Sequence, residues 1–292
     1  MSVSFCHIGG ATMASYRYRA LIPAREIGAS LNNPDADVLV FAKPHKQDVP
    51  YAIRAKHEGR KVIVDLCDPH LNLEHYQHLM SLADAVTCPT KWFADFLKED
   101  YDIDATAIGD PYEFDETPPH CAGVNLLWFG HGSNFDSLQR VLPAIQELPL
   151  KIVSNIEGFT PWSLENLHRE MGEADIVVMP ETAPYKSANR TVEAIRRGCF
   201  VVAEPHPAIN DFPGIWLGNI RKGIEWAQQN QQLANERTLE AQSFVRQWHS
   251  PKTLGSAWRT LTQRVASFSI SEPEGSSGPA GCPLISTLGM QT

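Results

Sequence analysis

Short apolar runs alternate with segments of helical periodicity along most of the chain. The apolar runs predict strands at residues 3–8, 38–42, 61–66, 85–88, 125–129, 151–154, 176–179 and 200–203. Apolar residues that recur every three or four positions predict helices at 16–30, 49–58, 73–83, 91–98, 135–147, 163–172, 191–197, 220–232, 236–248 and 252–266. Because a parallel strand pair needs a long crossover connection, strands separated by single helices predict parallel sheets.

The alternation is interrupted once, in an acidic stretch that contains two neighbouring prolines. We interpret residues 113–122 as a linker between two Rossmann-like domains, 1–112 and 123–250, followed by a helix at 251–267 and a disordered tail at 268–292. The predicted fold is therefore α/β, with two facing doubly wound parallel sheets. Ligands of such sheets bind beyond the carboxyl ends of the strands, so the expected site lies between the domains.

Composition excludes several classes of protein. The 292 residues are 43% hydrophobic and 20% charged, which rules out disorder across the whole chain. No run of about 18 apolar residues is present, and the first residues carry no basic stretch typical of a signal peptide, so we expect a cytoplasmic protein without a membrane-spanning helix. The net charge of -9 disfavours indiscriminate binding to nucleic acid. The six scattered cysteines form no CxxC pair, and no metal site is predicted.

Residues 175–203 carry a more specific pattern, DIVVMPETAPYKSANRTVEAIRRGCFVVA. An acidic residue precedes a strand that ends in a proline, and a loop leads into a helix that holds a glutamate, followed by a small residue, a glycine and an apolar strand. The residues of this pattern are Asp175, Pro180, Glu193, Ala194, Gly198 and Val201, Val202 and Ala203. The segment resembles the donor-binding region of GT-B glycosyltransferases, especially the retaining families that use nucleotide sugars.

The resemblance extends from residue 3 to about 266 and implies a function for the whole chain. It implies that a final helix carrying Trp258 crosses back onto the first domain. It also implies transfer of a sugar from a nucleotide-sugar donor, with a UDP-sugar favoured, to a hydroxyl acceptor. The transfer is expected to proceed with retention, without a metal and without any cofactor other than the donor substrate.

Three polar residues near the start of the helix at 191–197 are candidates for the donor diphosphate. Lys186, Asn189 and Arg190 supply two cations beside backbone amides at a helix N-terminus, together with Thr191 in the first turn. Glu193 occupies the position that the resemblance assigns to the donor ribose, where a carboxylate accepts hydroxyl hydrogen bonds. A solvated basic loop and an ordinary first-turn glutamate are the simpler alternatives.

Glycine-containing turns follow the first strand of each predicted domain. Gly132 and Ser133 lie in the loop after residues 125–129, and Gly10 occupies the equivalent turn of the first domain. Glycine lets a backbone approach phosphate closely, so these residues are expected to contact the donor. Arg17 and Arg19, one turn later, are candidates for the diphosphate or an anionic acceptor, although helical spacing cannot point both into one site.

Carboxylates close the third predicted strand and are candidates for acceptor activation. Asp68 is favoured over Asp65, with His70 as the third candidate, because a carboxylate at the carboxyl end of a strand can orient or deprotonate a hydroxyl. The departing phosphate is the alternative proton acceptor, and a simple turn at the Asp68–Pro69 pair is the structural alternative.

The sequence does not decide the identity of the acceptor, and it leaves alternative functions to be considered. A catalytically inert nucleotide-sugar binder of the same fold is the main alternative, whereas a dehydrogenase is disfavoured because the first glycine pair lacks GxGxxG spacing. Hydroxymethylated DNA is a minority hypothesis for the acceptor, since the first domain is rich in cations. These cations are Arg17, Arg19, Lys43, Lys46, Arg54, Lys56, Arg60 and Lys61.

Overall fold

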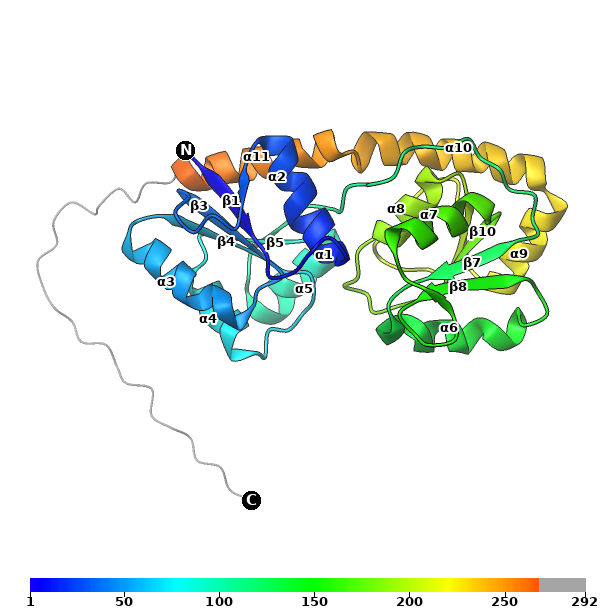
Figure 1. Ribbon diagram of the computed structural model, residues 1–292, viewed down its shortest axis with the longest axis horizontal. Helices are drawn as coiled ribbons and strands as arrows, with labels where there is room; N and C mark the ends of the chain where they lie inside the picture. Colours follow the sequence, from blue (N-terminus) through cyan, green and yellow to red (C-terminus); the bar gives the residue numbers. More distant parts are fainter. Residues whose placement is uncertain (268–292) are drawn as a thin grey trace, which may run out of the picture.

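The computed structural model describes residues 1–267 and contains two six-stranded parallel sheets that lie side by side (Figure 1). The first sheet has the order β2-β1-β3-β4-β5-β6, with β1 (Val3–Cys6), β2 (Ser30–Leu31), β3 (Val38–Ala42), β4 (Lys61–Asp65), β5 (Ala85–Cys88) and β6 (Ala105–Ala107). The second has the order β12-β11-β10-β7-β8-β9, with β7 (Leu126–Phe129), β8 (Leu150–Ser154), β9 (Thr160–Pro161), β10 (Ile176–Met179), β11 (Phe200–Ala203) and β12 (Trp216–Leu217). All strand pairs are parallel, which confirms the predicted α/β fold.

Helices connect most successive strands of both sheets, as the long crossovers of parallel pairing require. Those of the first sheet are α1 (Ala14–Tyr16), the π-helical turn η1 (Arg17–Leu21), α2 (Ile22–Ile27), the 3₁₀ turn η2 (Lys46–Asp48), α3 (Val49–His57), α4 (Glu74–Leu82) and α5 (Lys91–Tyr101). Those of the second are the 3₁₀ turn η3 (Gly132–Asn134), α6 (Phe135–Val141), the 3₁₀ turn η4 (Leu142–Ala144), α7 (Leu164–Glu173), α8 (Asn189–Arg196) and α9 (Ile220–Gln229). Two longer helices follow, α10 (Gln231–Trp248) and α11 (Pro251–Ser267).

Two predicted helices differ from the structure for identifiable reasons. The helix predicted at 16–30 begins two residues earlier, contains a π-helical turn and ends at Gly28, whose φ of 72° is left-handed. Glycine adopts this conformation without strain, so the chain can leave the helix and form β2. The helix predicted at 135–147 changes to a 3₁₀ turn after Val141, because Pro143 has no amide hydrogen for the α-helical ladder.

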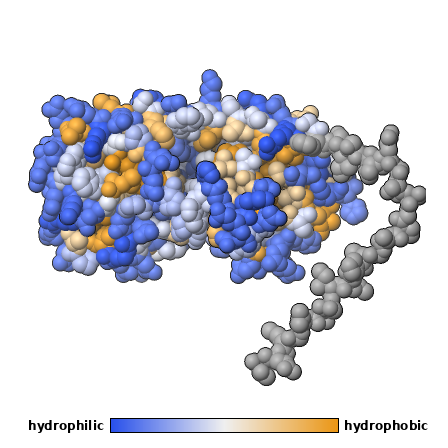
Figure 2. Space-filling model, turned by 180° about the vertical axis from the view of Figure 1, so that it is seen from behind, coloured by the Kyte–Doolittle hydropathy of each residue, from blue (hydrophilic) through white to orange (hydrophobic). Residues whose placement is uncertain are grey.

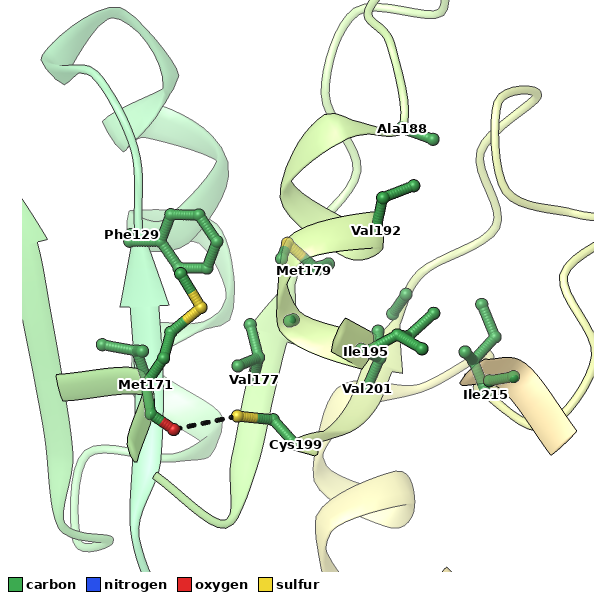
Figure 3. Close-up of a cluster of buried hydrophobic side chains, with 14 of the residues drawn as sticks. Phe129, Met171, Val177, Met179, Ala188, Val192, Ile195, Cys199, Val201 and Ile215 are labelled. Atoms are coloured by element: carbon green, nitrogen blue, oxygen red, sulfur yellow. Dashed lines mark hydrogen bonds between the residues drawn. The ribbon is translucent and has the colours of Figure 1, made fainter. Parts of the chain in front are cut away.

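Each sheet buries apolar residues on both faces. Figure 3 shows one cluster of the second sheet, in which Val177 of β10 and Val201 of β11 lie against Val192 and Ile195 of α8. In the same cluster the Cys199 thiol donates to the carbonyl oxygen of Met171. Packing on both faces explains why these strands read as continuous apolar runs in the sequence. It also fixes α8, which carries several of the candidate donor-binding residues.

The last two helices run along both halves of the molecule (Figure 1). α10 lies along the second sheet and α11 along the first, where Trp258 packs edge-on against Phe5 with ring centroids 5.1 Å apart. A Cβ atom at Gly255 of α11 would lie 2.6 Å from Glu26 Cβ, so a glycine is needed for this close approach to α2. The helices thus tie the two sheets together at one side.

The surface is mainly polar. Seen from behind in Figure 2, hydrophilic residues cover most of both halves, and hydrophobic residues gather in separate patches. Within residues 1–267 no helix is long and apolar enough to cross a membrane. The tail predicted at 268–292 lies outside the described residues.

Candidate functional site

The carboxyl ends of the two sheets meet at an ion pair between two residues that the sequence places on opposite domains. Asp68 follows β4 of the first sheet, and Lys186 follows β10 of the second. The Lys186 Nζ atom donates to Asp68 Oδ1 across 2.6 Å. The Nζ atom of Lys43, which follows β3, lies 3.8 Å from Asp68 Oδ2. The structure therefore brings the predicted base and a predicted phosphate ligand together.

The Asp68 carboxylate is held in its ionised form. Its side chain is 14% exposed, and burial by itself raises its pKa. The hydrogen bond and charge of Lys186, with a smaller effect of Lys43, outweigh burial and hold the pKa of Asp68 below its ordinary value. Asp68 is thus a charged acceptor of hydrogen bonds rather than a proton donor.

The loop that carries Lys186 is held at both of its ends. On the side of the second sheet, Glu204 accepts a hydrogen bond of 2.8 Å from the Glu181 amide, and His206 Nε2 lies 3.0 Å from the Ala183 carbonyl oxygen. On the other side, the Tyr185 ring packs against Phe93 of α5, with ring centroids 6.1 Å apart. These contacts place Lys186 Nζ at the junction, 4.9 Å from the centroid of the Tyr185 ring.

Arg190 lies in the first turn of α8 and is a partly buried cation. It donates a hydrogen bond of 3.1 Å to the carbonyl oxygen of Phe129, at the end of β7. Burial lowers the pKa of its guanidinium to about 10, and no carboxylate forms an ion pair with it within residues 1–267. A desolvated guanidinium without a counter-charge favours an anion beside it, since burial of an unpaired charge costs free energy.

A glycine makes room for this arginine. A Cβ atom at Gly130 would lie 3.2 Å from Arg190 Nη1 and 3.1 Å from the indole ring of Trp128. Both distances are tighter than ordinary van der Waals contact, so a larger residue would displace the guanidinium or the indole ring. Gly130 is therefore a positioning residue for Arg190.

No side chain caps the N-terminus of α8. Ala188 occupies the N-cap and provides no side-chain hydrogen bond, whereas Thr90, Ser163 and Asn219 cap α5, α7 and α9. The first-turn amides of a helix have no partner within the helix, and they carry partial positive charge. The predicted donor ligands lie here: Asn189 is partly exposed, and Thr191 is buried with 4% exposure.

The predicted glycine turns differ in how accessible they are. The Gly132 amide donates to Asn155 Oδ1 across 2.7 Å, and the Ser133 amide donates to His131 Nδ1 across 3.2 Å. Both amides are therefore already bonded to side chains of their own domain. Gly10 is exposed, with nothing within 4 Å of the place where a Cβ would lie. Donor contacts at these three positions remain predictions.

Glu193 is bonded to the segment that connects the two sheets. The Glu113 amide donates to its Oε1 atom across 2.6 Å, and the Phe114 amide donates to Oε2 across 3.1 Å. Tyr18 also donates to Oε1, and the residue is only 2% exposed. Burial, partly offset by these hydrogen bonds, raises the pKa of Glu193 to about 7. The structure uses this carboxylate to join the connecting segment to α8, and the ribose contact predicted for it remains untested.

Arg17 and Arg19 are buried rather than presented to an acceptor. Arg19 grips Asp65 through two hydrogen bonds of 2.9 and 2.5 Å and also donates to Asp110 Oδ1. Arg17 donates to Glu113 Oε2 across 2.8 Å and to the Ala11 carbonyl oxygen across 2.7 Å. With exposures of 3% and 2%, the two side chains hold elements together, because several of their donors already have acceptors.

His70 and the basic residues of the first domain are the remaining candidates for the acceptor side. His70 is exposed, and its ring lies edge-on to Tyr76 with centroids 5.8 Å apart. Carboxylates neutralise much of the predicted basic surface: besides the two buried arginines, the pairs are Lys43–Asp68, Arg54–Asp35, Lys56–Asp84, Arg60–Glu58 and Lys61–Asp84. Most of the cations that suggested DNA as an acceptor are therefore paired with carboxylates of the protein itself.

Some residues at the junction were not selected from the sequence. His7 directly follows β1; its Nε2 atom lies 3.1 Å from Ser15 Oγ, and burial lowers its pKa to about 4. Asn155 directly follows β8 and holds the Gly132 amide. A search restricted to residues after predicted strands would have found Asn155, since such positions line the carboxyl edge of a parallel sheet. It would have missed His7, because the predicted first strand runs to residue 8, whereas β1 ends at Cys6. No group of three or more metal-binding side chains is arranged around a common point within residues 1–267.

Solved structures resemble the whole described architecture. Anabaena HepE in complex with UDP and glucose matches with a TM-score of 0.72 and 12% identity, over 90% of this chain and 100% of that chain. The DNA-modifying enzyme β-glucosyltransferase, solved in the presence and absence of uridine diphosphoglucose, matches with a TM-score of 0.58 and 11% identity, over 92% of this chain and 100% of that chain. The chain has the GT-B glycosyltransferase fold.

The GT-B fold is also found in Staphylococcus aureus TarM, which matches with a TM-score of 0.61 and 13% identity over 77% of this chain and 55% of that chain. Comparison with protein-family models and with curated proteins finds no match. Identities of this size establish the GT-B fold alone, so the chemistry has to be argued from the residues of the junction.

Proposed function

We propose that the protein is a glycosyltransferase that moves a sugar from a nucleotide sugar, with a UDP-sugar favoured, to a hydroxyl acceptor. The observation that carries this proposal is the partly buried Arg190 guanidinium, which has no paired carboxylate within residues 1–267 and lies beside the uncapped N-terminus of α8. A cation and free amides converging at the carboxyl edge of a parallel sheet are suited to a phosphate group.

The donor diphosphate would lie between Arg190 and Lys186. These cations and the first-turn amides of α8, which include Asn189 and Thr191, would stabilise the negative charge that grows on the leaving group. The Gly10 turn and the loop of Gly132 and Ser133 lie after the first strand of each sheet, where their backbones can approach the donor. In this proposal the protein's own cations supply the positive charge at the leaving group, so no metal is needed.

Asp68 is the proposed acceptor-side group. During transfer the bond between the anomeric carbon and the diphosphate oxygen breaks, and a new bond forms between that carbon and the acceptor oxygen. The acceptor proton passes to Asp68 or to the departing phosphate, and the nucleoside diphosphate leaves. We propose retention at the anomeric carbon, following the resemblance of residues 175–203 to retaining families.

The solved structures support the choice of donor. HepE has been solved with UDP and with UDP-glucose, and it matches 90% of this chain. Because identity is 13%, this support concerns the class of donor and not the particular sugar.

Titration of the full chain with UDP, GDP and their sugar conjugates by isothermal calorimetry tests the donor site. A transfer and hydrolysis assay by mass spectrometry, with panels of donors and hydroxyl acceptors, then tests the reaction, and NMR of the product reports the anomeric configuration. Binding followed by turnover is expected. Binding without turnover would favour an inert nucleotide-sugar binder, and absence of binding would overturn the proposal.

A further inference from the structure

Asp68 differs from the buried carboxylates Asp65 and Asp175 in how it is held. Asp65 is fixed by Arg19 and by the Thr87 hydroxyl, and Asp175 accepts hydrogen bonds from the amides of Ala122, Val124 and Asn125. Such carboxylates hold local structure together. Within residues 1–267, the Asp68 carboxylate accepts one hydrogen bond, and its donor is Lys186 of the other sheet.

The ion pair with Asp68 also occupies Lys186, the cation that would bind the donor diphosphate. Lys186 is 35% exposed, so a phosphate from solvent can reach its Nζ atom, but the Asp68 carboxylate already occupies that cation. A carboxylate and a phosphate oxygen make the same charge-assisted hydrogen bond to an ammonium group and therefore compete for it. Tyr185, packed on Phe93, holds the loop in the position where this competition takes place.

We propose that Asp68 is a placeholder for the donor diphosphate: it holds Lys186 across the junction in the empty protein and releases it when a phosphate binds. This inference rests on the proposed function and adds to it the order in which the two substrates bind. Donor binding has to precede productive acceptor binding, because Asp68 becomes available to an acceptor hydroxyl only after Lys186 has moved to the phosphate.

The release also changes the chemistry of Asp68. While it is bonded to Lys186, its pKa lies below the ordinary value, which makes the carboxylate a weak proton acceptor. Transfer of Lys186 to a phosphate removes the main cause of this lowering. Lys43, whose Nζ atom lies 3.8 Å from Asp68 Oδ2, still favours the ionised form. The donor thereby strengthens the group that is to accept the acceptor's proton.

Calorimetric titration of UDP into wild type and Asp68→Asn tests the placeholder. Asparagine keeps the size of the side chain and removes its charge, so UDP should bind the variant about threefold to tenfold more tightly, as expected when a competing charge-assisted hydrogen bond to a partly exposed lysine is lost. This gain in UDP affinity over wild type should become smaller at about 0.5 M salt, where exposed charges are screened. A variant that merely damaged the structure would bind UDP more weakly.

Two further variants make the test specific. Glu74→Gln, at the exposed start of α4, makes the same change in net charge away from the ion pair and should leave UDP affinity within twofold of wild type. Lys186→Met should weaken UDP binding, and adding Asp68→Asn to it should change the affinity less than twofold, because the competition no longer exists.

The outcomes separate this inference from the proposed function. If wild type binds UDP and Asp68→Asn binds it equally or more weakly, the placeholder is overturned while the donor site stands. An equal gain in the Glu74→Gln variant would also overturn it, since overall charge would then explain the effect. If wild type binds neither UDP nor GDP, both the proposed function and the placeholder fail.

Discussion

Tyr18 donates a hydrogen bond of 3.0 Å to Glu193 and thereby joins η1 of the first sheet to α8 of the second. The same carboxylate accepts the amides of Glu113 and Phe114, which belong to the segment that connects the sheets. Three parts of the chain thus converge on one side chain. Since α8 also carries Arg190, the contact fixes the candidate donor site relative to the first sheet.

Replacement of Tyr18 by phenylalanine should lower the free energy of unfolding by about 0.5–1.5 kcal/mol, the usual contribution of a buried hydrogen bond. The loss is moderate because Glu193 Oε1 still accepts the Glu113 amide. Urea denaturation measures the change. Tyr51→Phe is the matched control, since Tyr51 is 48% exposed and should show no loss. Equal unfolding midpoints for the two variants would contradict the role given to Tyr18.

Glu193 should make the stability of the protein depend on pH. Its pKa is raised from 4.5 to about 7, so the folded state holds the proton more tightly than the unfolded chain does. The contribution of this group to stability is therefore fully present below pH 4.5 and is lost as the pH rises through 7. Urea denaturation of wild type and Glu193→Gln between pH 4.5 and 7 measures this contribution as the difference between their free energies of unfolding.

The Glu193→Gln variant should be less stable than wild type throughout this range. One of the two oxygens that accept backbone amides becomes an NH₂ group, which leaves a buried donor facing a donor at a cost of about 1–3 kcal/mol. The difference from wild type should be largest near pH 4.5 and should narrow towards pH 7. A difference that stays constant with pH would show that Glu193 does not titrate in this range.

Gly130→Ala should weaken donor binding, because the added Cβ would crowd Arg190 Nη1 and the Trp128 ring. Overpacking of this kind also costs about 1–3 kcal/mol of stability. Gly172→Ala is the control, since a Cβ at that helical position would lie an ordinary 3.6 Å from Arg197. That control should be stabilised by up to about 1 kcal/mol. Unchanged UDP affinity in Gly130→Ala, measured by calorimetry, would remove Gly130 from the site.

Arg190→Met should lower UDP affinity by about tenfold to a hundredfold, which corresponds to one charge-assisted hydrogen-bonding group. Arg190→Lys should recover part of the affinity, because it keeps the charge and loses the planar fork. Arg25→Met, at a side chain that is 70% exposed on α2, should bind UDP as wild type does. If Arg190→Met also retained wild-type affinity, the anion site would have to lie elsewhere.

The alternation of apolar runs and helical segments was enough to predict the fold. The β10 and β11 strands and the α3 helix lie close to their predicted bounds, because strands buried on both faces leave a strong signal in the sequence. The short strands β2, β6, β9 and β12 were missed, since two or three residues carry too little periodicity. The helix predicted from residue 91 begins there, and Thr90 caps it by accepting the Phe93 amide, a contact that depends only on neighbouring residues.

Tertiary structure determined which partners the charged side chains contact. The sequence placed Asp68, Lys186, Arg190 and Glu193 near the carboxyl ends of strands or at a helix start, which are local properties. It did not show that Lys186 bonds to Asp68, that Arg19 is buried on Asp65, or that Glu193 joins the connecting segment to α8. These partners lie 46 to 118 positions apart along the chain, and only the packing of the two sheets brings them within hydrogen-bonding distance.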